Sequence, residues 1–477
     1  MLKNKYYNVY LNKIIGLTIY CLFVIVCVFF IVYNATWTIG DQMQFLPLIK
    51  GHRISGFINP TMGRFMPLVF EDYNILWVIS KMQIKIDEWV GICIFTNVLE
   101  SQISVYSCYV INIIGFVALS IFLYLTLTKF VDKNSVFGVW EVVLSSMLFL
   151  LYSYKVQINT IYSERIMSLM IMIFIYFCIK FFETDKWYYA LISLLAAVYS
   201  TYCKEPFFGC LIVFCVTILI YDRKLSKNGK VYIYLLLFNA VLFLILYCVC
   251  VLPQIQSAYN NDMRDGASKL SVLIKTICEQ KLLVLFVPIV FFRMYKLLVQ
   301  KDIANILFDA LLFGGASYAV ACYILVLDGD YYLIPAFAMM IPPVAYYLNK
   351  YVKSYISIII LLICCIYYLF VDYREVKQSQ KIRVDTIERT SMLIDVCNND
   401  KCIYFEPFDR EESSTNWNEH VYWYFRNILK SYIAVRTGNF DFDYCETKPT
   451  SDFVNIKYCI SNFKEEEAMS AYCVEYN

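Results

Sequence analysis

The chain has 477 residues, of which 60% are hydrophobic and only 17% charged, and its mean hydropathy is +0.57. Soluble proteins contain roughly 45–50% apolar and about 25% charged residues, so this composition predicts a membrane protein that contacts the lipid bilayer. The formal net charge of +2 gives no electrostatic basis for binding nucleic acid. The only histidines are His52 and His420, which excludes a zinc site built on several histidines.

Apolar segments follow one another along the first three quarters of the chain. The segments are 14–33, 105–127, 136–151, 166–179, 187–202, 207–220, 231–252, 282–292, 303–327, 333–347 and 355–371. A membrane-spanning helix needs about 20 apolar residues, and several segments are shorter, so we expect about eleven spans. The first segment is too long for the apolar part of a signal peptide, and we interpret it as an uncleaved helix. Residues 1–371 are therefore predicted to form an α-helical polytopic membrane domain.

Lys and Arg recur in every second connection between these segments, which is the pattern that orients membrane proteins. Basic residues precede the first segment and follow the second, fourth, sixth, eighth and tenth. They are Lys3, Lys5, Lys13, Lys129, Lys133, Lys180, Lys186, Arg223, Lys224, Lys227, Lys230, Arg293, Lys296, Lys301, Lys350 and Lys353. We expect a cytoplasmic amino terminus in the inner or plasma membrane of a cell. Residues 35–104, the first long loop, are then extracytoplasmic.

The composition changes in residues 372–477, where charged residues, Asn and Ser return. The runs CIYFEP (402–407) and VNIKYCISN (454–462) are typical of short strands, and we expect a helix near Val421 to Val435. This tail is predicted to be a small extracytoplasmic α/β domain, large enough for a modest core. Its cysteines are odd in number, so a disulfide there would leave at least one thiol unpaired.

Asp41 lies just past the end of the first apolar segment, in NATWTIGD. A carboxylate at that edge could act as general base toward an acceptor hydroxyl, and the alternative is a solvated Asp that begins a loop. Asp41, Glu71 and Asp72 together offer the oxygen ligands that Mg or Mn prefers, and the sequence leaves the metal open.

The next two extracytoplasmic connections also carry ionisable residues at the membrane boundary. Glu164 and Arg165 occur in NTIYSERIM, and Lys204 and Glu205 occur in TYCKEPFF. Charge at this depth is costly unless it faces water or a partner, which makes these residues site candidates. Interfacial ion pairs or side chains that reach toward the headgroups are the structural alternative.

Arg64, in GRFMP, and Lys204 could hold a phosphate, because guanidinium is a two-pronged donor and ammonium a compact charge. The alternative is that GRF anchors an interfacial helix, with Arg64 toward the headgroups and Phe65 below. Gly63 before Arg64 would let the backbone approach a ligand closely. His52, Arg53 and Arg165 are candidate substrate-binding residues, although a solvated loop would also explain His52 and Arg53. The expected supporting acids are Glu71, Asp72, Glu164 and Glu205.

An acid after the first membrane helix, followed by a G-R-[FW] element in the first outer loop, resembles the GT-C superfamily of glycosyltransferases that use lipid-phosphate sugars. Within it the chain looks most like the bacterial O-antigen glucosyltransferase type, in which an Asp-Asp pair precedes GR[WF]. Here the element reads Gly40-Asp41-Gln42, so the second acid is replaced by Gln42. This departure leaves Asp41 as the base that the resemblance implies. An acid in the second outer loop and a Lys in the third, here Glu164 and Lys204, also occur in related enzymes.

The resemblance implies a hexosyltransferase of the cell envelope, active in polysaccharide biosynthesis. Its donor would be a polyprenyl-phosphate sugar, with the phosphate against Lys204 and Arg64 and the lipid tail between helices. The acceptor would be a glycan or a lipid-linked molecule on the extracytoplasmic side. Asp41 would deprotonate its hydroxyl for an inverting attack.

A flippase or transporter of lipid-linked glycans is the competing class, and it would need ionisable residues along a path through the membrane. The apolar segments are nearly free of charge apart from Glu141 and Asp309, near segment starts, which favours an enzyme that works at one face. A glycan polymerase is a third alternative. It would share the topology but depend on outer-loop arginines rather than on Asp41.

Overall fold

The computed structural model describes most of the helical part of the chain and four short strands of the tail. The described residues are 2–33, 56–69, 82, 105–131, 135–158, 163–222, 225–255, 276, 280–303, 305–325, 330–399, 402–405, 443–445, 454–458 and 472–476. The chain divides into two compact units. The first comprises residues 1–29, 55–72 and 112–372, and the second comprises residues 30–54, 73–111 and 373–477.

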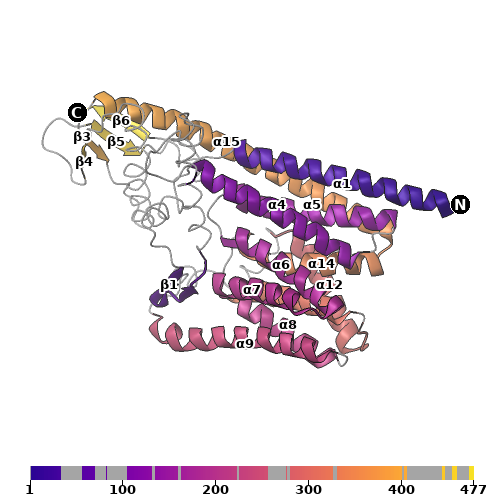
Figure 1. Ribbon diagram of the computed structural model, residues 1–477. Helices are drawn as coiled ribbons and strands as arrows, with labels where there is room; N and C mark the ends of the chain where they lie inside the picture. Colours follow the sequence, from indigo (N-terminus) through magenta and orange to yellow (C-terminus); the bar gives the residue numbers. More distant parts are fainter. Residues whose placement is uncertain are drawn as a thin grey trace. The chain divides into compact units, whose positions relative to one another are not determined.

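Each of the predicted apolar segments forms a helix (Figure 1). The helices are α1 (Leu2–Tyr33), α4 (Val105–Phe130), α5 (Val136–Ile158), α6 (Ser163–Thr184), α7 (Trp187–Cys203), α8 (Phe207–Tyr221), α9 (Lys227–Cys250), α12 (Leu282–Leu298), α13 (Ile306–Ile324), α14 (Ile334–Tyr351) and α15 (Ser354–Asn399). Among the described residues, eight helices are long and apolar enough to cross a membrane, and α8 is a shorter apolar helix. By length and composition the chain is therefore a multi-pass α-helical membrane protein. Of the eleven predicted segments, three form helices shorter than a full span, namely α7 with 17 residues, α8 with 15 and α12 with 17.

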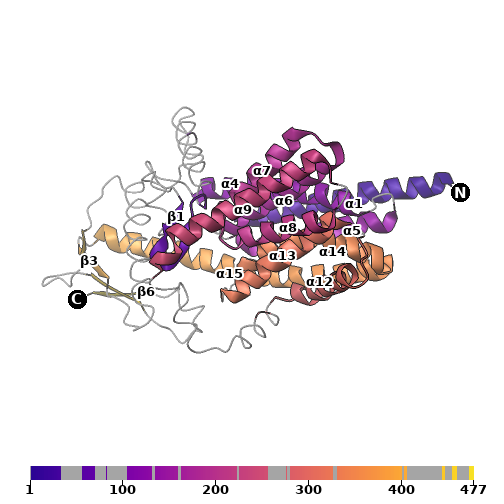
Figure 2. The ribbon, with the colours of Figure 1, turned by 90° about the horizontal axis from the view of Figure 1, so that it is seen from below.

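In the first unit the helices run side by side (Figures 1 and 2). α6 packs along α7, α8 lies between α9 and α13, and α14 contacts α5, α6 and α13. Some buried hydroxyls at these interfaces donate a hydrogen bond to the backbone carbonyl one turn earlier in the same helix. The Ser168 hydroxyl donates to the Glu164 carbonyl, and the Ser200 hydroxyl donates to the Ala196 carbonyl. The helices can therefore approach closely through small side chains.

Helix starts at one end of this unit carry side-chain caps. Ser226 accepts from the Gly229 N–H at the start of α9, and Asn305 accepts from the Phe308 N–H at the start of α13. Such caps satisfy backbone donors that the first helical turn leaves without a partner.

α12 extends beyond the predicted segment, which ended at Phe292, and continues to Leu298. Arg293 therefore lies inside a helix, not in a connection.

A β-hairpin forms from the described part of the first long loop. β1 (Phe57–Asn59) pairs antiparallel with β2 (Arg64–Met66) around a 3₁₀ turn at Pro60–Met62. The hairpin is anchored to the helices by backbone bonding, because the Leu68 N–H donates to the Tyr202 carbonyl at the end of α7 (3.1 Å). The Tyr247 hydroxyl, from α9, also donates to the Gly63 carbonyl (3.0 Å).

The second unit contains a four-stranded sheet in the order β4-β3-β5-β6. The strands are β3 (Cys402–Phe405), β4 (Asp443–Cys445), β5 (Val454–Tyr458) and β6 (Tyr472–Tyr476). β3 runs parallel to β4 and β5, and β5 runs antiparallel to β6. β3 and β5 lie in the two runs that the sequence marked as strands. The expected helix near residues 421–435 lies outside the described residues.

Candidate functional site

The turn between α7 and α8 presents two charged side chains at one end of the helical unit. Lys204 caps the end of α7, and its N–H donates to the Ser200 carbonyl. Pro206 precedes α8. Proline cannot continue the α7 hydrogen bonding, so the chain reverses within this turn. Lys204 and Glu205 are thereby fixed between two packed helices.

Lys204 forms an ion pair with Glu164, which lies in the first turn of α6. Lys204 Nζ lies 2.8 Å from Glu164 Oε1, and the side chains are 12% and 1% exposed. The ammonium also lies over the Tyr332 ring, 5.0 Å from its centroid. Burial alone would lower the pKa of Lys204, but the Glu164 carboxylate and further negative groups raise it above its usual value. The Glu164 carboxylate therefore favours the charged form of this nearly buried lysine.

Arg64 and Glu205 form a second pair that connects the hairpin to the helices. Arg64 Nη1 lies 3.7 Å from Glu205 Oε2, and the side chains are 12% and 10% exposed. Glu205 Oε1 accepts a hydrogen bond from the backbone N–H of Phe65 (3.1 Å). One carboxylate thus holds both the side chain and the backbone of β2. We call Arg64, Glu164, Lys204, Glu205 and Tyr332 the Lys204 cluster.

Arg165 is buried next to Glu164, with an exposed fraction of 4%. Its guanidinium approaches α4 at Gly115, where a Cβ added to the glycine would lie 3.8 Å from Nη1. Glu164 and Arg165, adjacent in sequence, therefore point to different neighbours: Glu164 toward the α7–α8 turn, and Arg165 toward α4.

An apolar groove between helices ends beside this cluster. It has a volume of about 700 Å³ and lies among α8, α12, α13 and α14. Its lining includes Leu333, which follows Tyr332 in the sequence, and Cys322 of α13. The Cys322 thiol donates to the Tyr332 carbonyl (3.8 Å), and the ring of Tyr332 carries the Lys204 ammonium. Tyr332 therefore contacts both a residue that lines the groove and the Lys204 ammonium.

The structure brings together candidate residues of three separate connections, namely Arg64, Glu164, Lys204 and Glu205, whereas Arg165 points toward α4. The remaining candidates, Asp41, His52, Arg53, Glu71 and Asp72, lie outside the described residues. Within the described part of the chain, no group of three His, Cys, Asp or Glu side chains could hold a metal ion.

Two tyrosines of the site were not predicted from the sequence. Tyr332 lies under the Lys204 ammonium, and Tyr247 bonds the hairpin turn at Gly63. Both belong to aromatic-rich stretches at helix ends, which are usually interpreted as interfacial belts. Nothing in their spacing distinguishes them from the other boundary tyrosines.

The sequence matches no protein-family model and no curated protein. Among solved structures, the chain is similar to the crystal structure of ArnT from Cupriavidus metallidurans bound to undecaprenyl phosphate. The similarity covers 92% of each chain, with a TM-score of 0.47 and 9% sequence identity.

Proposed function

We propose that this protein is a membrane glycosyltransferase that moves a sugar from a polyprenyl-phosphate donor to a glycan or lipid-linked acceptor on the extracytoplasmic side. The observation that carries the proposal is the Lys204 ammonium at the end of an apolar groove between helices. A lipid phosphate has one anionic group joined to a long apolar chain. A fixed cation beside a lipid-facing groove is the complementary arrangement.

Glu164 has a defined part in this proposal. A nearly buried ammonium without a partner would be costly and would tend to lose its proton. Glu164, which is 1% exposed, keeps Lys204 charged and oriented. A donor phosphate would then bind Lys204, with Arg64 as a second donor. Arg64 is held in place by Glu205.

The proposed reaction is a displacement at the anomeric carbon. The acceptor hydroxyl forms the new glycosidic bond while the bond from the anomeric carbon to the phosphate oxygen breaks, with inversion. The electron pair leaves with the lipid phosphate, whose charge Lys204 and Arg64 stabilise. Asp41, the base proposed from the sequence, accepts the hydroxyl proton. A divalent ion held by Asp41, Glu71 and Asp72 is compatible with this scheme but is not needed for its balance.

The placement of charge argues against a flippase or transporter. In the described helices α4 to α9 and α12 to α14, every Asp, Glu, Lys and Arg lies within about two turns of a helix end. Glu141 and Arg293 are the deepest of them, and both lie in the half of their helix away from Lys204. A path across the membrane would need polar groups in its middle.

The proposal is tested with purified protein in lipid nanodiscs and a panel of polyprenyl-phosphate sugars. Release of polyprenyl phosphate is measured for the wild type, Asp41→Asn, Lys204→Met and the control Lys129→Met. Lys129 forms an exposed pair with Glu183 (2.9 Å) and has no part in the proposal. We expect Lys204→Met to slow release about a hundredfold, as for other lost transition-state donors.

Wild-type release with one of the donors, reduced in Asp41→Asn and Lys204→Met but not in Lys129→Met, supports the transferase and both assigned roles. Release that persists in Asp41→Asn moves the base to another acid, with Glu164 and Glu71 the first to test. An absence of both turnover and saturable donor binding across the panel overturns the proposal in favour of the transporter class.

A further inference from the structure

α12 is weakly packed for a helix that forms a wall of the groove. Its buried residues are Leu282, Phe286, Arg293 and Leu297. Phe286 makes an edge contact with Phe337 of α14, with ring centroids 4.9 Å apart. Arg293 is the only charged residue among the four, and it is fully buried. The second half of α12 is therefore held by Leu297 and by the contacts of Arg293.

The Arg293 guanidinium binds a carboxylate on the neighbouring helix. Its Nε and Nη2 donate to the two carboxylate oxygens of Asp309 in α13, at 2.9 and 2.8 Å. Asp309 is also fully buried. The Tyr347 hydroxyl, from α14, donates to Asp309 Oδ1 as well. This two-pronged geometry fixes direction as well as distance between α12 and α13.

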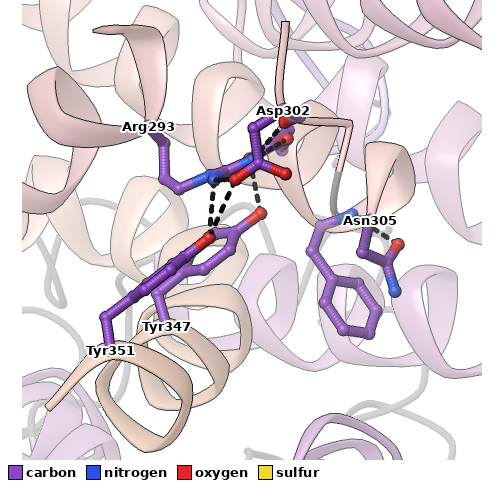
Figure 3. Close-up of polar contacts among 7 residues, drawn as sticks. Arg293, Asp302, Asn305, Tyr347 and Tyr351 are labelled. Atoms are coloured by element: carbon purple, nitrogen blue, oxygen red, sulfur yellow. Dashed lines mark hydrogen bonds and ion pairs between the residues drawn. The ribbon is translucent and has the colours of Figure 1, made fainter. Parts of the chain in front are cut away.

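The remaining guanidinium donors are also used. Nη1 donates to the Tyr351 hydroxyl (3.0 Å), and Nη2 donates to the Asp302 carbonyl (3.1 Å). The rings of Tyr347 and Tyr351 lie beneath the guanidinium, with centroids 4.7 and 5.9 Å from Cζ (Figure 3). We call Arg293, Asp302, Asp309, Tyr347 and Tyr351 the Arg293 clamp. It joins α12, α13 and α14.

The clamp lies at the end of the helical unit opposite Lys204. Asn305 caps the start of α13 and shares a small pocket with Asp185 and Asp222, at the far ends of α6 and α8 from the Lys204 cluster. α12 lines the groove from Leu283 to Leu298, a length of ~22 Å at 1.5 Å per residue. Arg293 lies in the last third of this length, on the same turns as the groove-lining residues Met294 and Leu297.

We propose that Arg293 is a positioning residue that sets the width of the inner half of the groove and so determines which lipid-chain lengths bind. The inference rests on the proposed lipid-phosphate donor. The phosphate of any such donor lies at Lys204, so a short tail ends in the outer half of the groove. Only a long tail reaches the wall that the clamp holds. Loosening the clamp should therefore weaken long donors selectively.

The test measures binding of two sugar-free lipid phosphates, undecaprenyl phosphate and geranyl phosphate, to the full chain in nanodiscs. Arg293→Lys keeps the charge but lacks the planar fork, so it cannot bridge both Asp309 oxygens. We expect it to weaken undecaprenyl phosphate about tenfold, equal to about 1.4 kcal/mol, with geranyl phosphate unchanged. Lys129→Met, which removes the exposed pair with Glu183, is the control and should change neither affinity.

A second variant guards against misfolding. Replacing both charges by apolar residues, Arg293→Met with Asp309→Leu, should retain the fold because a buried pair can be exchanged for apolar packing at little cost. It lacks the directional fork and should also lose the chain-length preference. In turnover assays both variants should raise KM for the undecaprenyl donor with kcat largely retained, which a general loss of folded protein would not produce.

The three possible binding results have different consequences for Arg293 and for the proposed donor. A wild-type preference for the long tail that is lost in the folded clamp variants supports the inference. A preference that persists in both variants overturns it and leaves the proposed function standing. A wild type that binds neither lipid phosphate overturns the proposed donor and with it this role of Arg293.

Discussion

Lys204 and Glu164 give the sharpest prediction at the scale of single residues. Burial lowers the pKa of Lys204 and the Glu164 carboxylate raises it, with a net rise above the ordinary value. A raised lysine pKa means that the charge, and the stability it contributes, is complete below the unfolded value of about 10.4 and is lost only above it. In the wild type, Lys204 should therefore make no contribution to pH dependence between about pH 7.5 and 9.5.

Glu164→Gln keeps the shape of the side chain but removes the negative charge that raises the pKa of Lys204 most. The pKa of Lys204 should then fall, because burial lowers it and only Tyr332 and Glu205 remain to raise it, so we expect the ammonium to lose its proton at a lower pH than in the wild type. We expect undecaprenyl phosphate to bind less tightly at about pH 9.5 than at about pH 7.5, a range above the second pKa of a phosphate monoester. Binding at the two pH values measures this.

Glu183→Gln is the matched control, because Glu183 pairs with Lys129 at an exposed site (2.9 Å). It should leave the affinity for lipid phosphate unchanged at both pH values. An affinity of Glu164→Gln that does not vary with pH would mean that Glu164 does not maintain the charge of Lys204.

Single residues also show how far sequence reasoning reaches. Glu164, Lys204 and Glu205 were candidates because charge at a membrane boundary is unusual. Interfacial ion pairs were the structural alternative, but the partners were not predicted, since the ion pair of Lys204 with Glu164 depends on how α6 packs along α7. Arg293 was interpreted as one basic residue of a cytoplasmic connection. Its burial required knowing that α12 extends by two further turns and that Asp309 faces it.

Among the structural elements, the hairpin of β1 and β2 offers a test through its glycines. Gly56 has φ of +73°, and an added Cβ would lie 2.3 Å from the Pro67 carbonyl oxygen. Gly63 has φ of +72°, but its nearest neighbour would be a side-chain carbon of Ile255 at 3.4 Å. Gly56→Ala must therefore move the hairpin, whereas Gly63→Ala meets only the strain of a positive φ, about 1–2 kcal/mol.

We expect Gly56→Ala to lower donor turnover by about tenfold or more, because β2 carries Arg64, and Gly63→Ala to lower it less. Gly209→Ala in α8 is the control, since an added Cβ there meets nothing within 4 Å. It should keep full turnover. Thermal unfolding of all three variants separates hairpin displacement from global destabilisation. Equal turnover in Gly56→Ala and Gly209→Ala would show that the position of the hairpin does not matter for turnover.

The elements themselves were predictable to different degrees. Continuous apolar runs located the helices, because a bilayer requires long apolar segments with internally satisfied backbones. Their ends were less well predicted: α15 was expected to stop at Val371, yet the helix continues to Asn399 through charged residues. The hairpin at residues 57–66 has too little periodic pattern to be recognised in a sequence. Gly63 was interpreted as a point of close ligand approach, and the positive φ that it adopts was not predicted.

At the scale of the whole molecule, the orientation in the membrane is the prediction on which the proposed function depends. The end of the helical unit opposite Lys204 collects basic residues from successive connections. Lys129 pairs with Glu183, and Asn228 donates to Asp185 (2.8 Å), so the ends of α4, α6 and α9 meet there. Basic connections remain on the cytoplasmic side during insertion. We therefore expect the Lys204 cluster to face the extracytoplasmic side.

Reporter fusions at two connections of the same hairpin of helices decide this orientation. A fusion within the α6–α7 connection, at Asp185, should give a fluorescent protein that folds in the cytoplasm and an inactive alkaline phosphatase. A fusion at Glu205, only one helix later, should give the reverse. The two sites are separated by α7 alone, whose 17 residues are short for a span at ~1.5 Å rise each. The pair therefore tests both the orientation and whether α7 crosses the membrane.

If both fusions report the cytoplasm, α7 does not cross, and the Lys204 cluster cannot meet an acceptor outside. If the two reports are exchanged, the site faces the cytoplasm, where nucleotide sugars are also available and a lipid-linked donor is no longer required. Only the expected pattern of the two fusions is consistent with the proposed site. A cation held by Glu164, a groove held by Arg293 and an orientation set by basic connections then act on one lipid phosphate at one face of the membrane.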